Sequence, residues 1–377
     1  MHLVVLVCCI VFSIFFGIQI FSLISINKST DKRKVKNYTN ADLPKVSLLL
    51  AARNEEVLLP RSLEAISQLK YPQDKLEILI GNDGSTDNTQ IIAEKYCKTH
   101  SNARIINITK NLGKGRGKAN VLAHLAHEAK GKVFFITDVD VRLHPGWIES
   151  LVREFNDNIG IVSGTSTCES NGTLFSRMQS IDWLHFMGYI QSFANVGVAC
   201  TSVGNNMAVL ADAYWETGGY ENIDFSITED YKLFEAVTNN GWGWRTILSP
   251  ESLGMAWYID NPIEMLHQRK RWLIGARDLP LNWKFMIVLY GLFLPALVLF
   301  ALYFPKVSLA IWLTKFIIQS VYITTLAGKV GLKAFSFIQL LVYEFYVMSN
   351  TFATGIFYFL PIPSLWKGRI YRNNDLT

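Results

Sequence analysis

The chain has 377 residues, a formal net charge of +5, and a composition that is 50% hydrophobic and 18% charged. This is more apolar than ordinary soluble usage, and the length suits one large domain with membrane helices or two soluble domains. The modest positive charge forms no basic patch interleaved with aromatic residues, which excludes nucleic acid as a partner. The five cysteines show no metal-ligand spacing, so neither a disulfide framework nor a zinc site is expected.

The apolar residues are concentrated in four segments, at 3–26, 285–304, 307–326 and 335–360. Each is about as long as the ~20 residues that cross a bilayer. The first has no positively charged start and no small-residue cleavage site, which favours a span over a signal peptide. Between Lys45 and Trp283 the composition is that of an ordinary globular domain. We therefore predict an integral membrane protein with a transmembrane helix at 1–27, a soluble domain at 45–272, an interfacial segment at 273–284 and about three transmembrane helices within 285–361.

A basic cluster directly after the first apolar segment sets the expected orientation, and it comprises Lys28, Lys32, Arg33, Lys34 and Lys36. Because basic residues beside a span favour the cytoplasm, we expect the N-terminus outside and the soluble domain in the cytoplasm, at an inner or plasma membrane. Anionic membrane lipids are the expected partners of this charge.

The side of the C-terminus stays open. Three C-terminal spans would place it outside, whereas the basic residues of the tail favour the cytoplasm, namely Lys367, Arg369 and Arg372. Only Pro305 and Lys306 separate two of the apolar segments, so one of the two need not cross fully.

Short apolar runs alternate with polar loops through the soluble stretch, at 46–51, 76–81, 103–108, 133–137 and 159–163. A helical pattern covers 55–69. Strands that are apolar throughout indicate a parallel sheet covered on both faces, in an α/β fold. In such sheets ligands bind beyond the carboxyl ends of the strands. The polar clusters ARNEE, NDGSTDNT and DVD follow three of these strands, and they predict a nucleotide site at that edge.

An aromatic-rich segment at 173–193 is expected to form an amphipathic helix. Its aromatic residues suit either of two roles. They can pack into a core, or they can lie at a membrane interface, where aromatic side chains are favoured.

Two aspartates, Asp138 and Asp140, stand one residue apart at the end of the run VFFIT. On a strand both would point to one face, which is the geometry for a shared cation. Carboxylates favour Mg²⁺ or Mn²⁺, and Mg²⁺ commonly bridges protein carboxylates and substrate phosphates. A D-x-D triplet is a weak signal alone, but its place at a strand end strengthens it.

Other charged residues follow in order along the chain. Asp83 lies in a turn, where it either caps the next helix or binds a ligand, and Asp87 fits the cap better. Lys118 ends a glycine-rich basic loop that is either a solvated turn or a phosphate contact, without Walker A spacing. Glu229 and Asp230 precede a helical pattern, where the helix dipole favours them or Asp230 acts as a general base.

The segment MLHQRKRWLIGA completes the series just before the C-terminal apolar block. Basic residues and tryptophan beside a membrane are ordinary anchors. As the last member of the series, however, Arg271 is expected to stabilise a departing diphosphate, and Trp272 to line an acceptor pocket.

Together these motifs resemble the family 2 inverting glycosyltransferases, which have the GT-A fold, a Rossmann-like domain with a mixed, mostly parallel sheet. The resemblance is to the membrane-bound branch with cellulose, chitin and hyaluronan synthases and ceramide glucosyltransferase, and it covers about 45–283 and the flanking helices. It implies a nucleoside site formed by Ala52, Asn54, Glu55 and Asp83.

The resemblance also implies that Lys118 lies near the donor, with Asp138 toward the nucleotide and Asp140 on the metal. Asp230 would be the general base. The acceptor and leaving-group side would comprise Gly204, Asn205, Glu229 and the Q-x-x-R-W residues Gln268, Arg271 and Trp272.

The implied reaction is a metal-assisted direct displacement that moves a sugar from a nucleotide-sugar, UDP-linked by expectation, to a hydroxyl of a lipid-linked or membrane-associated glycan acceptor. A processive polysaccharide synthase using the same site is the alternative, although the C-terminal spans are few for a long translocating channel. A non-catalytic membrane scaffold is disfavoured by the complete set of motifs. A transporter is suggested only by Lys315 and Glu344 within apolar segments, and these two residues can instead pair with each other.

Overall fold

The computed structural model describes residues 2–28, 35–36, 38–156, 158–366 and 369–371. The chain forms two compact units, each assembled from separate segments. A helical unit contains Met1–Asp31, Ser170–Cys200 and Tyr258–Trp366, and an α/β unit contains Lys32–Glu169, Thr201–Trp257 and Lys367–Thr377. Some of the basic residues used to predict orientation lie outside the described residues, namely Lys32, Arg33, Lys34, Lys367 and Arg372.

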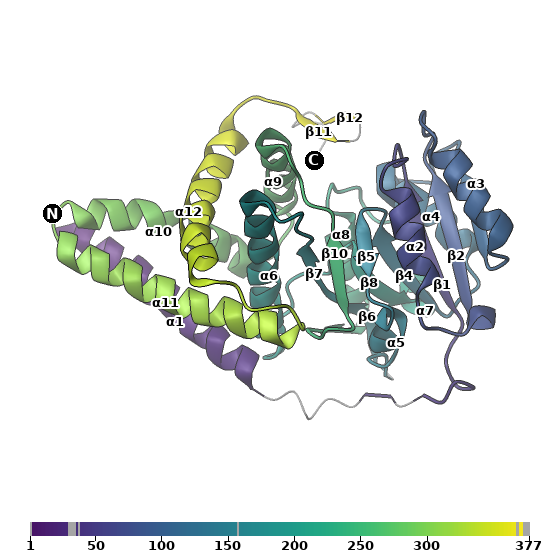
Figure 1. Ribbon diagram of the computed structural model, residues 1–377, viewed down its shortest axis with the longest axis horizontal. Helices are drawn as coiled ribbons and strands as arrows, with labels where there is room; N and C mark the ends of the chain where they lie inside the picture. The colour runs from purple at the N-terminus through teal and green to yellow at the C-terminus, as the bar shows by residue number, and fades with distance from the viewer. Residues whose placement is uncertain (1, 29–34, 37, 157, 367–368, 372–377) are drawn as a thin grey trace. The chain divides into compact units, whose positions relative to one another are not determined.

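Seven strands form the main sheet of the α/β unit, in the order β3-β2-β1-β4-β8-β6-β9 (Figure 1). Their bounds are β1 Val46–Ala52, β2 Leu76–Asn82, β3 Ala103–Asn107, β4 Val133–Asp138, β6 Ile159–Ser163, β8 Asn206–Leu210 and β9 Gly243–Thr246. The first four strands run parallel, β8 is antiparallel to both β4 and β6, and β9 is parallel to β6. All five strands expected from the apolar runs are present, and the mixed, mostly parallel sheet is confirmed.

A second, three-stranded sheet has the order β5-β10-β7, with bounds β5 Val141–Leu143, β7 Thr165–Cys168 and β10 Leu253–Ala256. The α/β unit also contains the last short strand, β12 Arg369–Tyr371. Its helices are α2 Leu59–Ser67, the 3₁₀ turn η1 Gln73–Lys75, α3 Thr89–Thr99, α4 Gly117–Glu128, α5 Trp147–Val152, α7 Ala211–Glu216 and α8 Glu229–Asn239.

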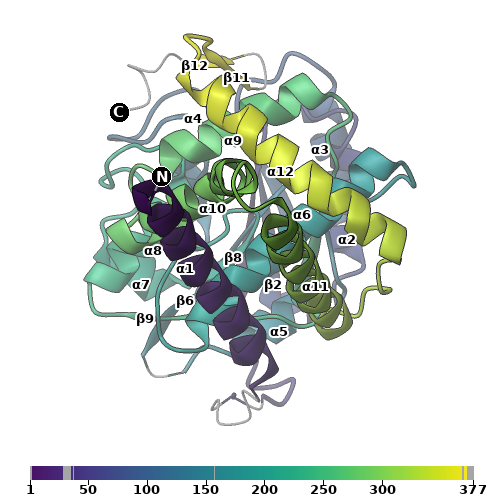
Figure 2. The ribbon, with the colours of Figure 1, turned by 90° about the vertical axis from the view of Figure 1, so that its left-hand side faces the viewer.

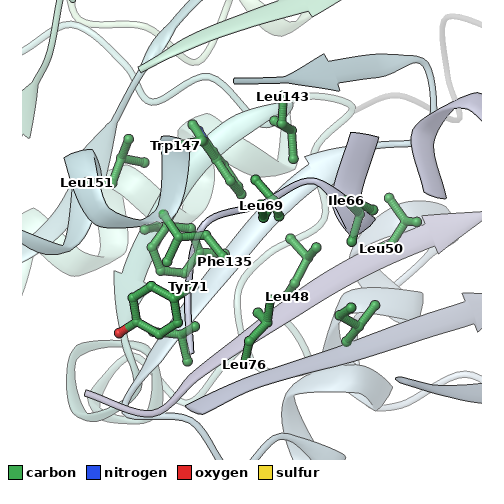
Figure 3. Packing of buried hydrophobic residues seen from close by; sticks show 14 of the residues in the cluster. Leu48, Leu50, Ile66, Leu69, Tyr71, Leu76, Phe135, Leu143, Trp147 and Leu151 are labelled. Atoms are coloured by element: carbon green, nitrogen blue, oxygen red, sulfur yellow. The ribbon is translucent and has the colours of Figure 1, made fainter. Parts of the chain in front are cut away.

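Alternate residues of the central strands are buried on opposite faces of the sheet, as period-two geometry requires. Leu48 and Leu50 pack with Ile66 of α2 and with Phe135 and Trp147 in one hydrophobic cluster (Figure 3). The opposite face meets α4 so closely that a Cβ on residue 81 would lie 2.3 Å from a side-chain carbon of α4, which requires the glycine present there. Helices on both faces explain why these strands are apolar throughout.

The helical unit contains α1 His2–Asn27, α6 Leu174–Ala194, α9 Pro262–Gly275, α10 Leu281–Ala301, α11 Pro305–Lys329 and α12 Phe337–Phe359, followed by β11 Ser364–Trp366. Helix α1 packs against α10 and α11, and these helices face the viewer in Figure 2. The contact between α1 and α10 is aromatic, with Phe12 and Phe15 against Phe293 at ring-centroid distances of 5.6 and 4.3 Å. Helix α9 runs through residue 272, where the sequence predicted a domain boundary.

Three helices of the described chain are long and apolar enough to cross a membrane: α1, α10 and α11. Two of these, α10 and α11, lie in the C-terminal region where about three spans were expected. Helix α12 has 23 residues, among them Gln339, Glu344 and Asn350, and its crossing of the membrane stays a prediction. The predicted helix at 173–193 is confirmed as α6, which packs against α1, α11 and α12.

Lys315 of α11 and Glu344 of α12 pair with each other in the interior of the helical unit. The Lys315 Nζ lies 2.7 and 2.6 Å from the two carboxylate oxygens of Glu344. Gln319 accepts from the same ammonium at 3.0 Å and donates to Glu344 at 2.9 Å. Because all three side chains are buried, their mutual hydrogen bonds offset part of the cost of desolvating two charges.

Candidate active site

The candidate site lies at the carboxyl ends of β1, β2 and β4, as the sequence predicted. Strands β1 and β4 are neighbours and pair Ala51 with Asp138. Asp83 directly follows β2, and its backbone N–H donates to the carbonyl of Ala52 at 2.9 Å. Arg53 donates to the backbone oxygen of Asp83 at 2.6 Å and lies 3.7 Å from its carboxylate. These three loops therefore converge on one edge of the sheet.

The loop after β1 is locked to the loop after β2. Asn54 has φ of 52°, a left-handed conformation that asparagine tolerates better than most residues. Its N–H donates to Ser85 Oγ at 3.1 Å, and its side-chain oxygen accepts from the Thr86 N–H at 2.9 Å. The N–H of Glu55 donates to Thr89 Oγ1 at 2.7 Å. Asn54 and Glu55 thus shape the edge of the site, and their contact with a nucleoside stays a prediction.

Lys118 lies at the start of α4 and joins two of the predicted acidic positions. Its Nζ is 2.6 Å from Asp138 Oδ1 and 3.1 Å from Glu229 Oε1, and it donates to the carbonyl of Gly204 at 3.2 Å. Burial disfavours the charged ammonium, but Asp138 and Glu229 outweigh burial and hold the pKa of Lys118 well above its usual value. Lys118 is therefore a permanent cation inside the site.

Asp230 is a half-buried acid of the site. It follows Glu229 in the first turn of α8, where the sequence placed it. Its Oδ2 accepts from the Gly204 N–H at 2.7 Å, and its Oδ1 accepts from the Tyr231 N–H at 2.8 Å. Burial, followed by the nearby charge of Glu229, raises the pKa of Asp230 to about 6, while Lys118 opposes the shift. A carboxyl with this pKa can exchange a proton near neutral pH.

Gly204 is required at its position because of Asp230. A Cβ added to Gly204 would lie 2.9 Å from the Cβ and 3.1 Å from Oδ2 of Asp230. The neighbouring Asn205 is mostly buried, and its side chain accepts from Ser166 at 2.8 Å. The sequence predicted this segment as part of the acceptor side, and the structure adds that Gly204 contacts the candidate base.

Asp138 and Asp140 differ from the expected geometry. Strand β4 ends at Asp138, and Asp140 lies in the turn before β5, so the two do not share a strand face. Within the described chain there is no cluster of three or more His, Cys, Asp or Glu residues suited to a metal. Mg²⁺ is commonly held by one or two carboxylates together with substrate phosphates, so a cation held by Asp138 or Asp140 together with a diphosphate stays a prediction.

Helix α9 of the helical unit carries Gln268, Arg271 and Trp272. Asn261 caps its start by accepting from the Ile263 N–H at 2.8 Å. The ring of Trp272 lies edge-on to that of Trp183 on α6, with centroids 5.1 Å apart. Trp272 therefore has a defined packing partner within its own unit.

Sequence reasoning missed the two residues between Gln268 and Arg271. Arg269 lies 2.5 Å from the carboxylate of Asp182 on α6, and its guanidinium stacks 4.4 Å from the ring centre of Trp272. The Nζ of Lys270 donates to three backbone carbonyls at the C-terminal end of α12, those of Phe357, Leu360 and Ile362, at 3.2, 2.7 and 2.9 Å. These two side chains fasten α9 to α6 and to α12.

Asn206 is a second feature that the sequence did not reveal. Its side chain is fully buried, accepts from Trp147 Nε1 at 2.7 Å, and donates to the carbonyls of Thr165 and Ser252 at 2.8 and 2.9 Å. All of its hydrogen-bonding groups are used in joining β8 to neighbouring elements, which makes it a structural residue. Its partners are remote in the sequence, so no local pattern indicated them.

Comparison with protein families matches residues 47–218 to "Glycosyl transferase family 2" and residues 133–361 to "Glycosyl transferase family group 2". The second match covers more than half of the chain. The chain belongs to the family 2 glycosyltransferases. The resemblance expected from the ordered motifs is thereby confirmed, and the protein is a transferase.

Several curated relatives of this glycosyltransferase make polysaccharides or glycolipids. It is 28% identical to a probable glycosyltransferase of Bacillus subtilis, over 64% of this chain and 57% of the relative. It is 26% identical to the poly-β-1,6-N-acetyl-D-glucosamine synthase of Staphylococcus epidermidis, over 63% of this chain and 56% of the relative. It is 23% identical to the β-monoglucosyldiacylglycerol synthase of Synechocystis, over 72% of this chain and 58% of the relative. The chain thus spans a little over half the length of these relatives.

The glycosyltransferase also matches a solved structure over almost its whole length. This is a mannosyltransferase from Pyrobaculum calidifontis in complex with GDP-mannose and Mn²⁺, with a TM-score of 0.57 and 16% identity, covering 94% of this chain and 98% of the other. At that identity the likeness shows the fold, and the predicted GT-A fold is confirmed.

Proposed function

We propose that this glycosyltransferase moves one sugar from a nucleotide-sugar, with UDP-sugars as the first candidates, to a hydroxyl of a lipid-linked or membrane-associated acceptor. The observation that carries the proposal is the presence of two half-buried, oppositely charged groups, Asp230 and Lys118, at the candidate site. Asp230 has a pKa of about 6 and is oriented by two backbone N–H groups. Lys118 is a cation paired with the strand-end carboxylate of Asp138.

In the proposed reaction Asp230 accepts the proton of the acceptor hydroxyl as its oxygen attacks the anomeric carbon of the donor sugar. The bond from that carbon to the diphosphate breaks in the same displacement, so the anomeric configuration inverts and the nucleoside diphosphate leaves. General-base help of this kind contributes about 10²–10⁴-fold in rate. Arg271, with Gln268 beside it on α9, is assigned to the charge of the leaving diphosphate, and Trp272 to the acceptor.

Asp140, with Asp138 beside it, is assigned to a divalent cation, Mg²⁺ or Mn²⁺. When bound, such a cation offsets charge on the diphosphate as a Lewis acid. The nucleoside is assigned to Ala52, Asn54, Glu55 and Asp83, whose loops converge at the sheet edge. Asn205 and Glu229 belong to the acceptor and leaving-group side in the same assignment.

We place the α/β unit in the cytoplasm of a cell with the protein in its inner or plasma membrane. Three candidate spans, α1, α10 and α11, support this placement, because an odd number of spans after an outside N-terminus leaves the basic C-terminal tail on the cytoplasmic side. Protection of a C-terminal tag from protease in right-side-out vesicles is the expected result, and its digestion there would refute this topology.

A donor panel tests the proposed reaction. The detergent-purified protein is given UDP- and GDP-sugars with Mg²⁺ or Mn²⁺ and a membrane lipid extract, and nucleotide release and the glycosylated product are measured. We expect release with one donor class, a product carrying a single added sugar, and inverted configuration by NMR. A ladder of products would instead support the processive synthase, for which the polysaccharide synthases among the relatives provide the precedent. If none of the donors tested gives nucleotide release, the proposal is contradicted.

A further inference from the structure

A cavity of about 290 Å³ lies within the helical unit, between α1, α10, α11 and α12. Its walls are almost wholly apolar, formed by phenylalanine, leucine, isoleucine, valine, methionine and glycine residues. Among its lining residues Lys315 is the one with a charge, and its ammonium is already paired with Glu344. The cavity therefore offers a ligand hydrocarbon contacts and no uncompensated charge.

The cavity is partly open to its surroundings, since its lining residues Phe352, Ile356 and Phe359 are 58, 50 and 83% exposed, and its apolar walls favour apolar ligands. Three of the four helices around it are candidate membrane spans, so the apolar material within reach is lipid. The volume is just below the ~300–1,000 Å³ of ordinary ligand pockets, which suits part of one chain rather than a whole lipid.

Part of the cavity wall is formed by the end of α12 that contacts α9, the helix that carries the glycosyltransferase motif. Gly355, Ile356 and Phe359 of α12 line the cavity. In the same turns of α12, the carbonyls of Phe357 and of Leu360 just beyond the helix accept from Lys270 of α9. A chain held in the cavity would thus have its head group near α9.

We propose that this cavity holds an acyl chain of the acceptor, and that the acceptor is therefore an acyl lipid with a free hydroxyl, with diacylglycerol as the probe that represents this class. The proposal rests on the proposed function and adds the class of acceptor to it. Chain burial contributes binding energy remote from the reacting hydroxyl, and such remote binding energy orients the reacting group.

Two glycines allow the cavity to be filled without disturbing its walls. A Cβ added to Gly291 of α10 or Gly355 of α12 would meet no atom within 4 Å. Gly291→Leu and Gly355→Leu therefore place a side chain in open space from two different helices, and each replaces a poor helix former by a good one. The matched control is Gly17→Leu on the exposed part of α1, where a Cβ likewise meets nothing within 4 Å and which does not line the cavity.

The experiment uses the full chain in nanodiscs and a diacylglycerol with a diazirine at the end of one acyl chain. We expect light to label peptides of α10 and α12 in the wild type and in Gly17→Leu, with labelling reduced at least fivefold in both filled variants. The KM for long-chain diacylglycerol is expected to rise about tenfold in the filled variants, and much less for a short-chain analogue. Equal loss in two variants on different helices argues against misfolding of either.

Three results would overturn the proposal: unchanged labelling in the filled variants, lost labelling with an unchanged KM for diacylglycerol, or preferential labelling by an isoprenyl phosphate probe. Nucleotide release by the wild type with the donor panel and a membrane lipid extract is measured separately. Its absence would refute the proposed function itself, while labelling still reports whether the cavity binds an acyl chain.

Discussion

At the scale of single residues, the site is organised by close contacts to Asp230 rather than by charge alone. The backbone N–H of Gly204 donates to the carboxylate of Asp230, and the lack of a side chain on Gly204 leaves space for that carboxylate. The segment 204–206 and the acidic residues at the start of α8 therefore form one feature. Lys118 adds a cation that offsets the mutual repulsion of three nearby carboxylates, those of Asp138, Glu229 and Asp230.

Gly204→Ala should reduce kcat by roughly 10²-fold, because a Cβ 2.9 Å from that of Asp230 must displace the base and misplacement of about 1 Å has this effect. Steady-state kinetics with the identified donor measure it. Gly146→Ala is the control, since a Cβ there makes only ordinary contacts at 3.4 Å or more. Equal activity of the two variants would show that the contact between Gly204 and Asp230 is unimportant.

The pH profile should report Asp230. The base works only when deprotonated, and burial raises its pKa to about 6, so kcat/KM should fall about tenfold per pH unit below that value and level off above it. Rates measured between pH 4.5 and 8.5 in constant-ionic-strength buffers provide the test. A limb centred near the ordinary aspartate value of about 3.9 would be inconsistent with a buried base.

At the scale of elements, helix α9 is held in place by the two residues that the Q-x-x-R-W motif leaves unspecified. Arg269 reaches α6 and Lys270 reaches the end of α12, where a cation also complements the negative end of the helix dipole. Gln268 and Arg271, which flank this pair, are the residues assigned to the leaving diphosphate.

Lys270→Met should therefore lower kcat more than it changes the donor KM, and it should lower the melting temperature, because three carbonyls lose a buried donor at a cost of about 1–3 kcal/mol for each unsatisfied group. Kinetics and thermal unfolding in detergent measure both effects. Lys329→Met, an exposed lysine at the end of α11, is the control. A melting temperature that drops with unchanged kcat would assign Lys270 to stability only.

The Lys315–Glu344 pair should behave as a buried ion pair between α11 and α12. Removing one partner, as in Glu344→Ala, leaves a buried charge and should reduce stability by about 3–5 kcal/mol, whereas Lys315→Met combined with Glu344→Leu should be much milder. Thermal unfolding of the two variants and the wild type compares them. If the double variant is as unstable as Glu344→Ala, the ion pair contributes more to stability than the mutual compensation of two buried charges.

At the scale of the whole molecule, the sequence predicted what depends on local patterns. Five strands were visible because apolar runs buried on both faces contain few polar residues. The site at the sheet edge followed from the placement of Asp83 and Asp138 at strand ends, a rule of topology. The start of α8 at Glu229 followed from an acidic first turn before a periodic segment.

What the sequence could not reveal depends on contacts between distant segments. The antiparallel insertion of β8 beside β4 and the partners of Asn206 arise from tertiary packing. The anchors of Arg269 and Lys270 lie 87 or more residues away along the chain.

The most direct test of the account compares nucleotide release by the wild type and Asp230→Asn, with donor affinity measured in parallel by calorimetry. Asparagine has nearly the same shape but cannot take a proton, so turnover should fall by about 10²–10⁴-fold while the donor still binds within a few-fold of wild type. Turnover within tenfold of wild type, with donor binding intact, would contradict the assignment of Asp230 as the base on which the proposed mechanism depends.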